Sequence, residues 1–393
     1  MKKMVSRSWV TKILALVFML TLTGMAGLFA IDIRVNPPQI TGDNKILVDQ
    51  IQNRVNILFA QQRARFQNEV QGINDNPQNM IGAFATSSIF SSTGASLRTY
   101  QGYDAFAVTL GAMGGLQTLG NPFSWAFGFL GELNNIINVF DRTGDIQAGV
   151  NPQLLNAQIG VNASKFLQEG LYFGLKAGFF NLDLPLPFED YDFSFRTWSI
   201  GGLVNYQIIP QIRVPGGAVV WRGLNIGTGL IYQGTNLILG LPLFSDGGNV
   251  SFPISVPMFG SIIGEIRNAK FEMDFNVNTL TVPLEAVTSV RLLGFVNASL
   301  GGGLDFGFGS AGLGGDIDAS INVNIPYGLG LRQEKPGSFT VSMGGKNSPA
   351  LINPKIIGSF GFSAGPAIIM DIPITYYFLN NGYNIGISFG FVW

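Results

Sequence analysis

Residues 383–393 read YNIGISFGFVW, and this stretch decides the fold. Every second residue is large and apolar, whereas most of the residues between them are small or polar. A period of two indicates a β-strand with one apolar face and one polar face. The apolar row consists of Tyr383, Ile385, Ile387, Phe389, Phe391 and Trp393. We therefore predict a strand with hydrocarbon on one side and water on the other.

The same stretch resembles the C-terminal closing strand of bacterial outer-membrane β-barrels. In that family, an alternating apolar strand that ends in Phe or Trp is the assembly signal, and residues 383–393 match it in type and position. The resemblance implies a transmembrane barrel in the bacterial outer membrane. Its expected partners are outer-membrane lipid and the barrel-assembly machinery.

The composition fits a protein that crosses a membrane with strands. The chain is 47% hydrophobic and only 12% charged, with a mean hydropathy of +0.30, whereas soluble domains carry about a quarter charged residues. Beyond residue 30 no uncharged apolar run reaches the ~18 residues of a transmembrane helix. High hydropathy without long apolar runs is what lipid-facing alternation produces.

Residues 1–30 are predicted to be a signal peptide. A basic start at residues 2–12 precedes an uncharged, largely apolar stretch with small residues at Ala26 and Ala30, where cleavage is expected. The alternative is an uncleaved membrane anchor. The segment position and its small residues favour cleavage and export.

The absence of Cys and His excludes several functions. Ser-His-Asp chemistry, Cys-His chemistry and histidine metal sites all need residues that the chain lacks. Outer-membrane phospholipases and aspartyl-type proteases use a histidine, so no enzyme, metal site or cofactor is predicted. Residues 31–393 carry a net charge of −5, because the leader holds four of the 23 Lys and Arg and none of the 24 Asp and Glu. Without a basic patch, no nucleic-acid partner is expected.

Residues 31–100 are predicted to form an N-terminal helical segment. Residues 43–70 repeat apolar side chains at intervals of three, four and seven, which indicates an amphipathic helix capped by Thr41 or Asp43. Gly72 and residues 74–77 end that helix, and residues 81–99 are expected to be irregular. The segment is interpreted as a lumen plug, a periplasmic extension or an assembly helix.

Residues 101–393 are predicted to form the barrel. Alternating stretches recur, most clearly as a hairpin at residues 156–180, and a bulge is expected near Arg196. A strand is expected at residues 125–129, and most of residues 234–267 are interpreted as a long loop that can include one strand at residues 237–243. The predicted fold class is all-β: a closed antiparallel transmembrane β-barrel of about 14 strands, with an uncertainty of two, behind the N-terminal segment.

Charged residues within the alternating strands are the candidate lumen residues. A charge is costly on the lipid face and cheap on a wet inner face. The candidates are Lys176, Lys270, Glu272, Asp274, Glu285, Arg291, Asp305, Asp316, Asp318 and Asp371. A calcium site at Asp316 and Asp318 is the alternative to lumen-facing charge there. Residues 307–312 match a dinucleotide fingerprint but lack the helix that should follow, so a glycine-rich hairpin is favoured.

The favoured function is a passive channel or transporter for small solutes. About 14 strands behind an N-terminal segment is also similar to the long-chain fatty acid transporter family, in which a hatch fills the lumen and a kinked strand opens the wall. Asn76-Pro77 matches the start of that family's Asn-Pro-Ala motif, but Gln78 replaces the alanine. This resemblance implies hydrophobic solutes. The alternative function is a surface adhesin or structural barrel that acts through its extracellular loops.

Overall fold

The computed structural model describes most of the chain beyond residue 29. The described residues are 30–71, 76–93, 105–117, 149–164, 166–185, 192–213, 218–242, 250–256, 260–325, 330–364 and 367–393. Residues 1–29 of the predicted leader and the predicted strand at residues 125–129 lie outside these ranges.

Strands dominate the described part. They are β1 (Ala30–Asn36), β2 (Gln39–Gly42), β3 (Phe106–Gln117), β4 (Gly149–Asn162), β5 (Leu171–Pro185), β6 (Asp192–Ile209), β7 (Ile212–Arg213), β8 (Val219–Pro242), β9 (Val250–Val256), β10 (Gly260–Leu292), β11 (Val296–Asn324), β12 (Leu331–Lys335), β13 (Gly337–Asn347), β14 (Ile352–Ala364), β15 (Ile368–Tyr377) and β16 (Gly382–Val392). Two helices precede β3: α2 (Lys45–Gln71) and α3 (Asn76–Thr93). No helix in the described ranges has the length and apolar character needed to cross a membrane.

A 14-stranded antiparallel sheet organises the molecule. Its pairings return to their start, because β10 pairs with β8 on one side and with β11 on the other. The result is a ring of ten strands in the order β11-β14-β15-β16-β3-β4-β5-β6-β8-β10. The all-β class and the large antiparallel sheet are therefore as predicted. The ring is smaller than the predicted 14 strands, because β1, β7, β9 and β13 pair outside it.

Alternation divides the ring into an apolar outer face and a more polar inner face. On β5, Leu175 is 68% exposed, whereas the next residue, Lys176, is 1% exposed. The last strand follows the same rule: Ile385, Phe389 and Phe391 are exposed and Asn384 is buried between its neighbours. The large apolar side chains that residues 383–393 present therefore point away from the ring.

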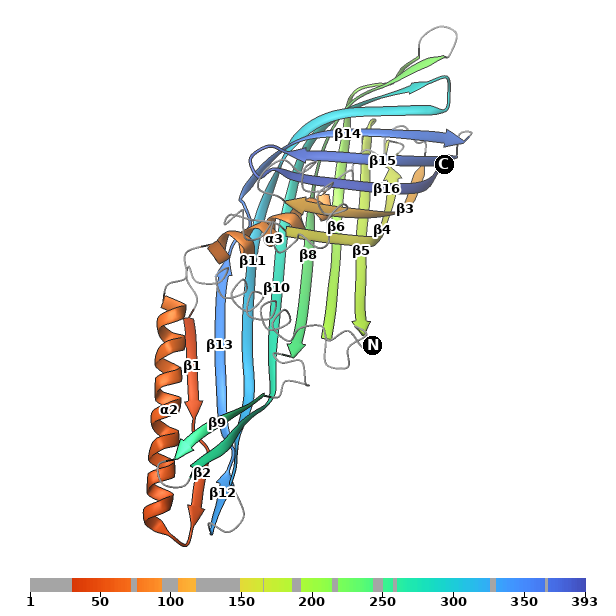
Figure 1. The fold of residues 1–393 in the computed structure, drawn as a ribbon. Helices are drawn as coiled ribbons and strands as arrows, with labels where there is room; N and C mark the ends of the chain where they lie inside the picture. The colour runs from red at the N-terminus through yellow and green to blue at the C-terminus, as the bar shows by residue number, and fades with distance from the viewer. Residues whose placement is uncertain are drawn as a thin grey trace, which may run out of the picture.

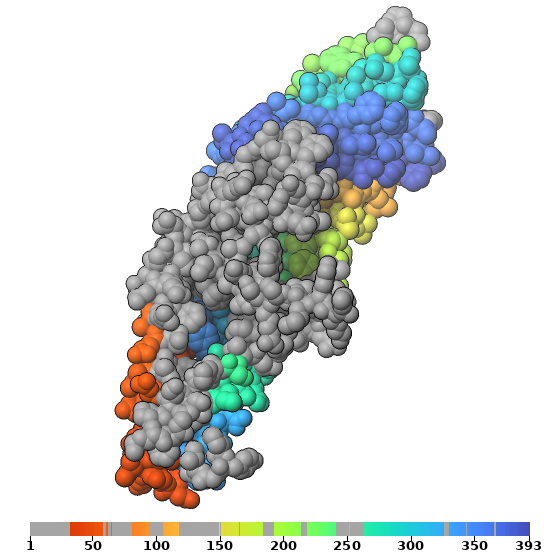
Figure 2. Space-filling view, in the orientation of Figure 1, coloured from red at the N-terminus to blue at the C-terminus, as the bar shows by residue number. Residues whose placement is uncertain are grey.

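The strands β10 and β11 run beyond the ring and carry a second layer (Figure 1). We call this part the extension: α2, β1, β2, β9, β12 and β13, with residues 260–278 of β10 and 310–324 of β11. Leu47, Ile51 and Val55 of α2 pack on Ile321 and Val323 of β11. The molecule is elongated, with α2 at one end and the ring towards the other (Figures 1 and 2).

The N-terminal helices differ in detail from the prediction. The Leu47 backbone N–H donates to Asn44 Oδ1 (3.2 Å), so Asn44, and not Thr41 or Asp43, caps α2. Helix α3 covers residues that were expected to be irregular. Its Ser and Thr residues have weak helix propensity, but small side chains allow close packing on several sides, and tertiary packing overrides propensity here.

Residues 234–267 are mostly strand, so the predicted long loop is wrong. Strand β8 continues to Pro242, β9 covers Val250–Val256 and β10 begins at Gly260. Prolines misled the prediction: Pro242 is the last residue of β8, and Pro253 lies in β9, an edge strand, where a missing N–H is tolerated. The bulge expected near Arg196 is also absent from the β6 pairings, and the β6–β8 register shifts at Gln207 instead.

Candidate functional site inside the ring

Helix α3 lies against the inner face of the ring. It contacts β3, β4, β8, β10, β11 and β16, which lie on different sides of the ring, as well as β13. Residues 85–93 of α3 are all buried, and most of them are Ala, Ser or Thr. Small side chains let a helix approach the surrounding backbone closely, so the residues that look unstructured in the sequence are suited to this place.

Glycines on the wall make room for α3. A Cβ on Gly115 of β3 would overlap the Ser87 carbonyl oxygen and come within 2.6 Å of the Ser91 nitrogen. A Cβ on Gly382 of β16 would overlap the Phe90 ring. Close backbone approach is a common reason for glycine inside a strand. The wall and the helix are therefore fitted to each other on two sides of α3.

Polar side chains hold α3 in place. Ser91 Oγ lies 3.2 Å from Asn151 Oδ1 on β4, to which it donates, and accepts from Gln233 Nε2 on β8 (3.1 Å). On β16, Asn384 Nδ2 donates to the Phe90 carbonyl oxygen (2.7 Å). Such bonds each contribute about 0.5–1.5 kcal/mol net, and leaving one partner unsatisfied costs more. These hydrogen bonds therefore fix the position of α3 inside the ring.

A buried ion cluster lies at the C-terminal end of α3. Lys355 Nζ on β14 lies 2.5 Å from Glu285 Oε1 on β10 and 2.6 Å from Asp305 Oδ1 on β11, and all three side chains are at most 1% exposed. The second oxygen of Asp305 accepts from Thr93 Oγ1 (2.8 Å) and Tyr377 OH (3.1 Å). The cluster therefore joins three wall strands to the last residue of α3.

Lys176 makes a second contact with the same helix end. Its Nζ on β5 donates to the Ser92 carbonyl oxygen at 2.5 Å. The last carbonyls of a helix lack intrahelical partners and carry partial negative charge, which suits a cation. Lys355 lies between Glu285 and Asp305, whereas Lys176 is held by the Ser92 carbonyl. Buried charges are tolerated only where they are paired and hydrogen-bonded.

The structure separates the predicted lumen residues into two groups. Lys176, Glu285 and Asp305 come together at α3, and Asp371 on β15 and the half-buried Arg291 on β10 lie elsewhere in the ring. The remaining five lie on the outward face of the extension: Lys270, Glu272, Asp274, Asp316 and Asp318. Lys270 Nζ forms an ion pair there with Asp192 (2.8 Å). No three acidic side chains of the described residues are grouped as metal ligands.

The prediction missed Lys355, Tyr377 and Thr93. The sequence did contain a signal for Lys355, because it is the single charged residue in the strand INPKIIGSFGFSA. Lys176 is likewise the single charged residue in residues 171–180 of its own strand. A lone lysine between apolar and small residues must face inward in a membrane strand. Thr93 had no such signal, since its role depends on α3, which was not predicted.

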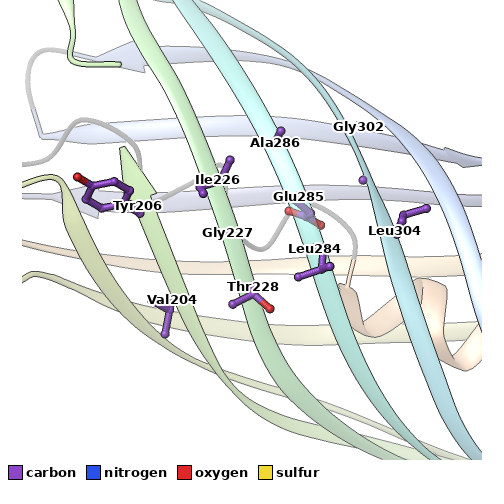
Figure 3. Close-up of a pocket in the computed structure, with 11 residues that line it drawn as sticks. Val204, Tyr206, Ile226, Gly227, Thr228, Leu284, Glu285, Ala286, Gly302 and Leu304 are labelled. Atoms are coloured by element: carbon purple, nitrogen blue, oxygen red, sulfur yellow. The ribbon is translucent and has the colours of Figure 1, made fainter. Parts of the chain in front are cut away.

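An apolar groove of about 500 Å³ lies on the opposite side of the same wall (Figure 3). Outward side chains of β6, β8, β10 and β11 line it, among them Val204, Tyr206, Ile226, Leu284 and Leu304. Glu285 is also among the lining residues, although its side chain is buried on the inner face. The groove therefore belongs to the outer surface, and the ion cluster lies on the inner side of the same wall.

These features define a class: a ring of antiparallel strands with an apolar outer surface, a polar inner wall and a helix seated between its sides. The chain belongs to the Lsa36-like family, whose model matches residues 38–393. A search of curated proteins finds no match.

Solved structures of outer-membrane β-barrels share a weak architectural similarity with the chain, as residues 383–393 led us to expect. The translocator domain of the autotransporter NalP from Neisseria meningitidis is 8% identical, with a TM-score of 0.34 over 73% of this chain and 87% of that chain. The Pseudomonas putida toluene transporter TodX is 10% identical, with a TM-score of 0.23 over 79% and 98%. A Pseudomonas aeruginosa FadL homologue is 8% identical, with a TM-score of 0.23 over 73% and 89%.

Proposed function

We propose that the chain is an outer-membrane channel or transporter for small solutes, with the ten-stranded ring as its transmembrane barrel and α3 as a plug in its lumen. In hydrocarbon every backbone polar group needs a partner, and a ring of strands meets this condition because it has no free edge. The exposed outer residues, such as Leu230 and Leu300, are apolar as lipid requires. The proposal assigns no catalytic step, cofactor or nucleic-acid partner to the chain.

The polar seat of α3 is the observation that carries this proposal. A helix that served only as a core element would be expected to bury apolar side chains, but α3 meets the wall through Ser87, Ser91 and Thr93 as well as Ile89 and Phe90. Water can replace such polar contacts at small net cost. Water can therefore replace the polar contacts of Ser91 and Thr93 with the wall, whereas Ile81 and Ala85 hold α3 in an apolar cluster with Phe271 and Phe275 of β10.

The inner wall favours polar solutes. Several buried side-chain atoms on it have no partner among the described residues, including Gln158 Oε1 on β4, Asn205 Nδ2 on β6 and both amide atoms of Asn225 on β8. Unsatisfied buried polar groups are costly unless water or a ligand binds them. We therefore propose water, ions and small polar molecules as the solutes, ahead of the hydrophobic ones that the fatty acid transporter resemblance implies.

Assembly is proposed to follow from the last strand. Strand β16 pairs with β15 and β3 and so joins the two ends of the ring. Trp393 stacks on Phe106 with ring centroids 5.9 Å apart, and its backbone bonds with the start of β3. Barrel-assembly machinery that reads residues 383–393 would thus act on the strand that completes the ring, after export and cleavage of residues 1–30.

A disulfide lock tests the plug directly, because the chain has no cysteine of its own. Gly82 of α3 lies beside the Asn347 side chain of β13, because a Cβ on Gly82 would come 3.7 Å from Cγ of Asn347. Two side chains in such contact are suitable positions for an engineered disulfide. We expect Gly82→Cys/Asn347→Cys to conduct in planar bilayers when reduced and to close when oxidised. Each single cysteine variant is the matched control and should not respond to oxidant.

Two results would contradict the plug. A locked variant that conducts as well as its reduced form would place the solute path elsewhere. A chain that is folded in lipid but carries no current, reduced or oxidised, would remove the channel function altogether.

A second candidate function is binding at a surface outside the membrane. The extension favours it, because it is a large folded layer in which β1, β2, β9, β12 and β13 pair outside the ring. The predicted loop at residues 234–267 would contribute to this surface as strand β9 and the start of β10. Binding to a partner surface that survives the disulfide lock, together with absence of current, would support this candidate over the channel.

A further inference from the structure

The outward face of β10 and β11 changes from apolar to polar partway along each strand. On β10 the outward residues are Leu280 and Leu284 on one side of the change, and Asn278 and Asp274 on the other. On β11 the outward row changes between Phe308 and Ser310. Leu280 pairs with Phe308, and Asn278 pairs with Ser310, so both strands change at the same level.

Three more neighbouring strands change at this level. Tyr232 of β8 pairs with Leu280 of β10 on one side and with Ile200 of β6 on the other. Trp198 is the neighbouring outward residue of β6, and it pairs with Phe179 of β5. Beyond them the outward rows continue with Gly234 and Asn236 on β8, Arg196 on β6 and Asn181 on β5. A row of Phe, Trp and Tyr followed by polar residues marks the interface between a bilayer and water.

The length of the apolar zone agrees with a bilayer. From Leu280 to the end of β10 at Leu292 the strand covers roughly 40 Å at ~3.4 Å per residue. A tilt of ~40° reduces this to about 30 Å along the membrane normal, which is the thickness of the hydrocarbon core. The extension therefore begins where the hydrocarbon ends.

The inner face changes in the opposite sense. Inside the ring, β10 presents Thr281 and Glu285, whereas in the extension it presents Phe271 and Phe275, which are buried. These two phenylalanines share one apolar cluster with Ile81 of α3. The extension is thus built like a water-soluble layer, polar outside and apolar within, and its core is continuous with the plug.

The two ends of the ring also differ in their connections. At the end that holds Trp393, few residues separate β4 from β5, β10 from β11 and β14 from β15 in the sequence. At the other end, few residues separate β5 from β6 and β15 from β16, but β8 and β10, and β11 and β14, are joined through the extension, and 31 residues separate β3 from β4. Outer-membrane barrels have short periplasmic turns and longer extracellular connections.

We infer that the extension is an extracellular arm, standing in water beyond the aromatic row at the end of the ring opposite Trp393 and joined through one apolar core to α3. The inference rests on the proposed membrane barrel and adds its orientation. From Ser310 to Asn324 the arm reaches roughly 45 Å along β11. A molecule outside the cell that bound the arm would therefore bind a layer whose apolar core also holds Ile81 of α3.

Single cysteines test the orientation. Ser320→Cys reports on the arm, and Glu169→Cys reports on the short turn between β4 and β5 at the other end. We expect a membrane-impermeant maleimide to label Ser320→Cys on intact cells, and Glu169→Cys only after the outer membrane is permeabilised. Labelling of Ser320→Cys that requires permeabilisation, or labelling of Glu169→Cys on intact cells, would overturn the inference.

A second pair of cysteines tests the underlying barrel separately. Ser310→Cys and Phe308→Cys are neighbouring outward positions on the two sides of the polarity change. In lipid vesicles we expect the maleimide to label Ser310→Cys, whereas Phe308→Cys should lose labelling until detergent is added. Equal labelling of both would refute the membrane ring itself, whereas the expected difference combined with reversed cell labelling would refute only the orientation.

Discussion

Replacement of Lys355 should destabilise the ring more than any other single loss of charge in the cluster. Lys355→Met leaves Glu285 and Asp305 facing each other with no cation between them, and all three side chains are at most 1% exposed. Breaking a buried ion pair by removing one partner costs about 3–5 kcal/mol. We therefore expect the free energy of unfolding of Lys355→Met to fall by at least 3 kcal/mol, which is on the order of a hundredfold in the folding equilibrium.

Lys270→Met is the matched control. It removes the same positive charge from the ion pair with Asp192, whose side chains are 43% and 68% exposed. Exposed pairs contribute below about 1 kcal/mol because water and salt screen them. Both variants change the net charge equally, so the difference between them reports burial alone.

Urea unfolding in phospholipid vesicles, followed by tryptophan fluorescence, measures both variants. If Lys355→Met loses no more stability than Lys270→Met, the cluster is not buried as described. The triple variant Lys355→Met/Glu285→Gln/Asp305→Asn should recover part of the loss, because neutral amides cost less to bury than unpaired carboxylates. No recovery would assign the loss to packing and not to charge.

Two further pairs of variants test the plug seat and the membrane zone. Gly115→Ala should destabilise the protein by about 1–3 kcal/mol and increase the open time in planar bilayers, because the new methyl group meets the backbone of α3. Gly114→Ala is the control and should change neither quantity, because nothing lies within 4 Å of its Cβ. Equal effects of the two variants would place α3 away from β3. Leu284→Arg, in the middle of the apolar zone, should lower the free energy of unfolding in lipid by about 2–4 kcal/mol. Asp316→Arg in the extension should change it by no more than about 0.5 kcal/mol. An unchanged free energy for Leu284→Arg would mean that this face does not meet lipid.

Alternation alone was enough to predict the strands and the sheet. The pattern around Phe173 and Leu175, or around Phe389 and Phe391, has one period and one direction of polarity, and the structure follows it. The same pattern could not say which face meets lipid. Phe271 alternates with Lys270 as Leu175 alternates with Lys176, yet Phe271 is buried in the extension while Leu175 is exposed on the ring.

The ion cluster was only partly predictable for a related reason. Charge inside an alternating strand identified Lys176, Glu285 and Asp305 as inward-facing candidates, because the cost of charge in hydrocarbon depends on the face and not on the fold. Their common partner, α3, came from a stretch rich in Ser and Thr, whose weak propensity hides a helix that tertiary packing stabilises. Thr93 could not be recognised before that helix was seen.

The polarity change also explains why the ring has ten strands although the sheet has more. Strand β13 pairs with β11 beyond Ser310 and carries Thr340 and Ser342 on its outward row, and β1 carries Asp32 and Arg34 there. Drawing these strands into the wall would put charged side chains into hydrocarbon, where an arginine near the midplane costs about 2–4 kcal/mol. The strands that close the ring, such as β14 and β16, present Ile356, Phe360 and Phe389 outward instead. For the membrane ring proposed above, strand chemistry, and not the number of strands available, therefore sets the size of the ring and leaves β1 and β13 outside it.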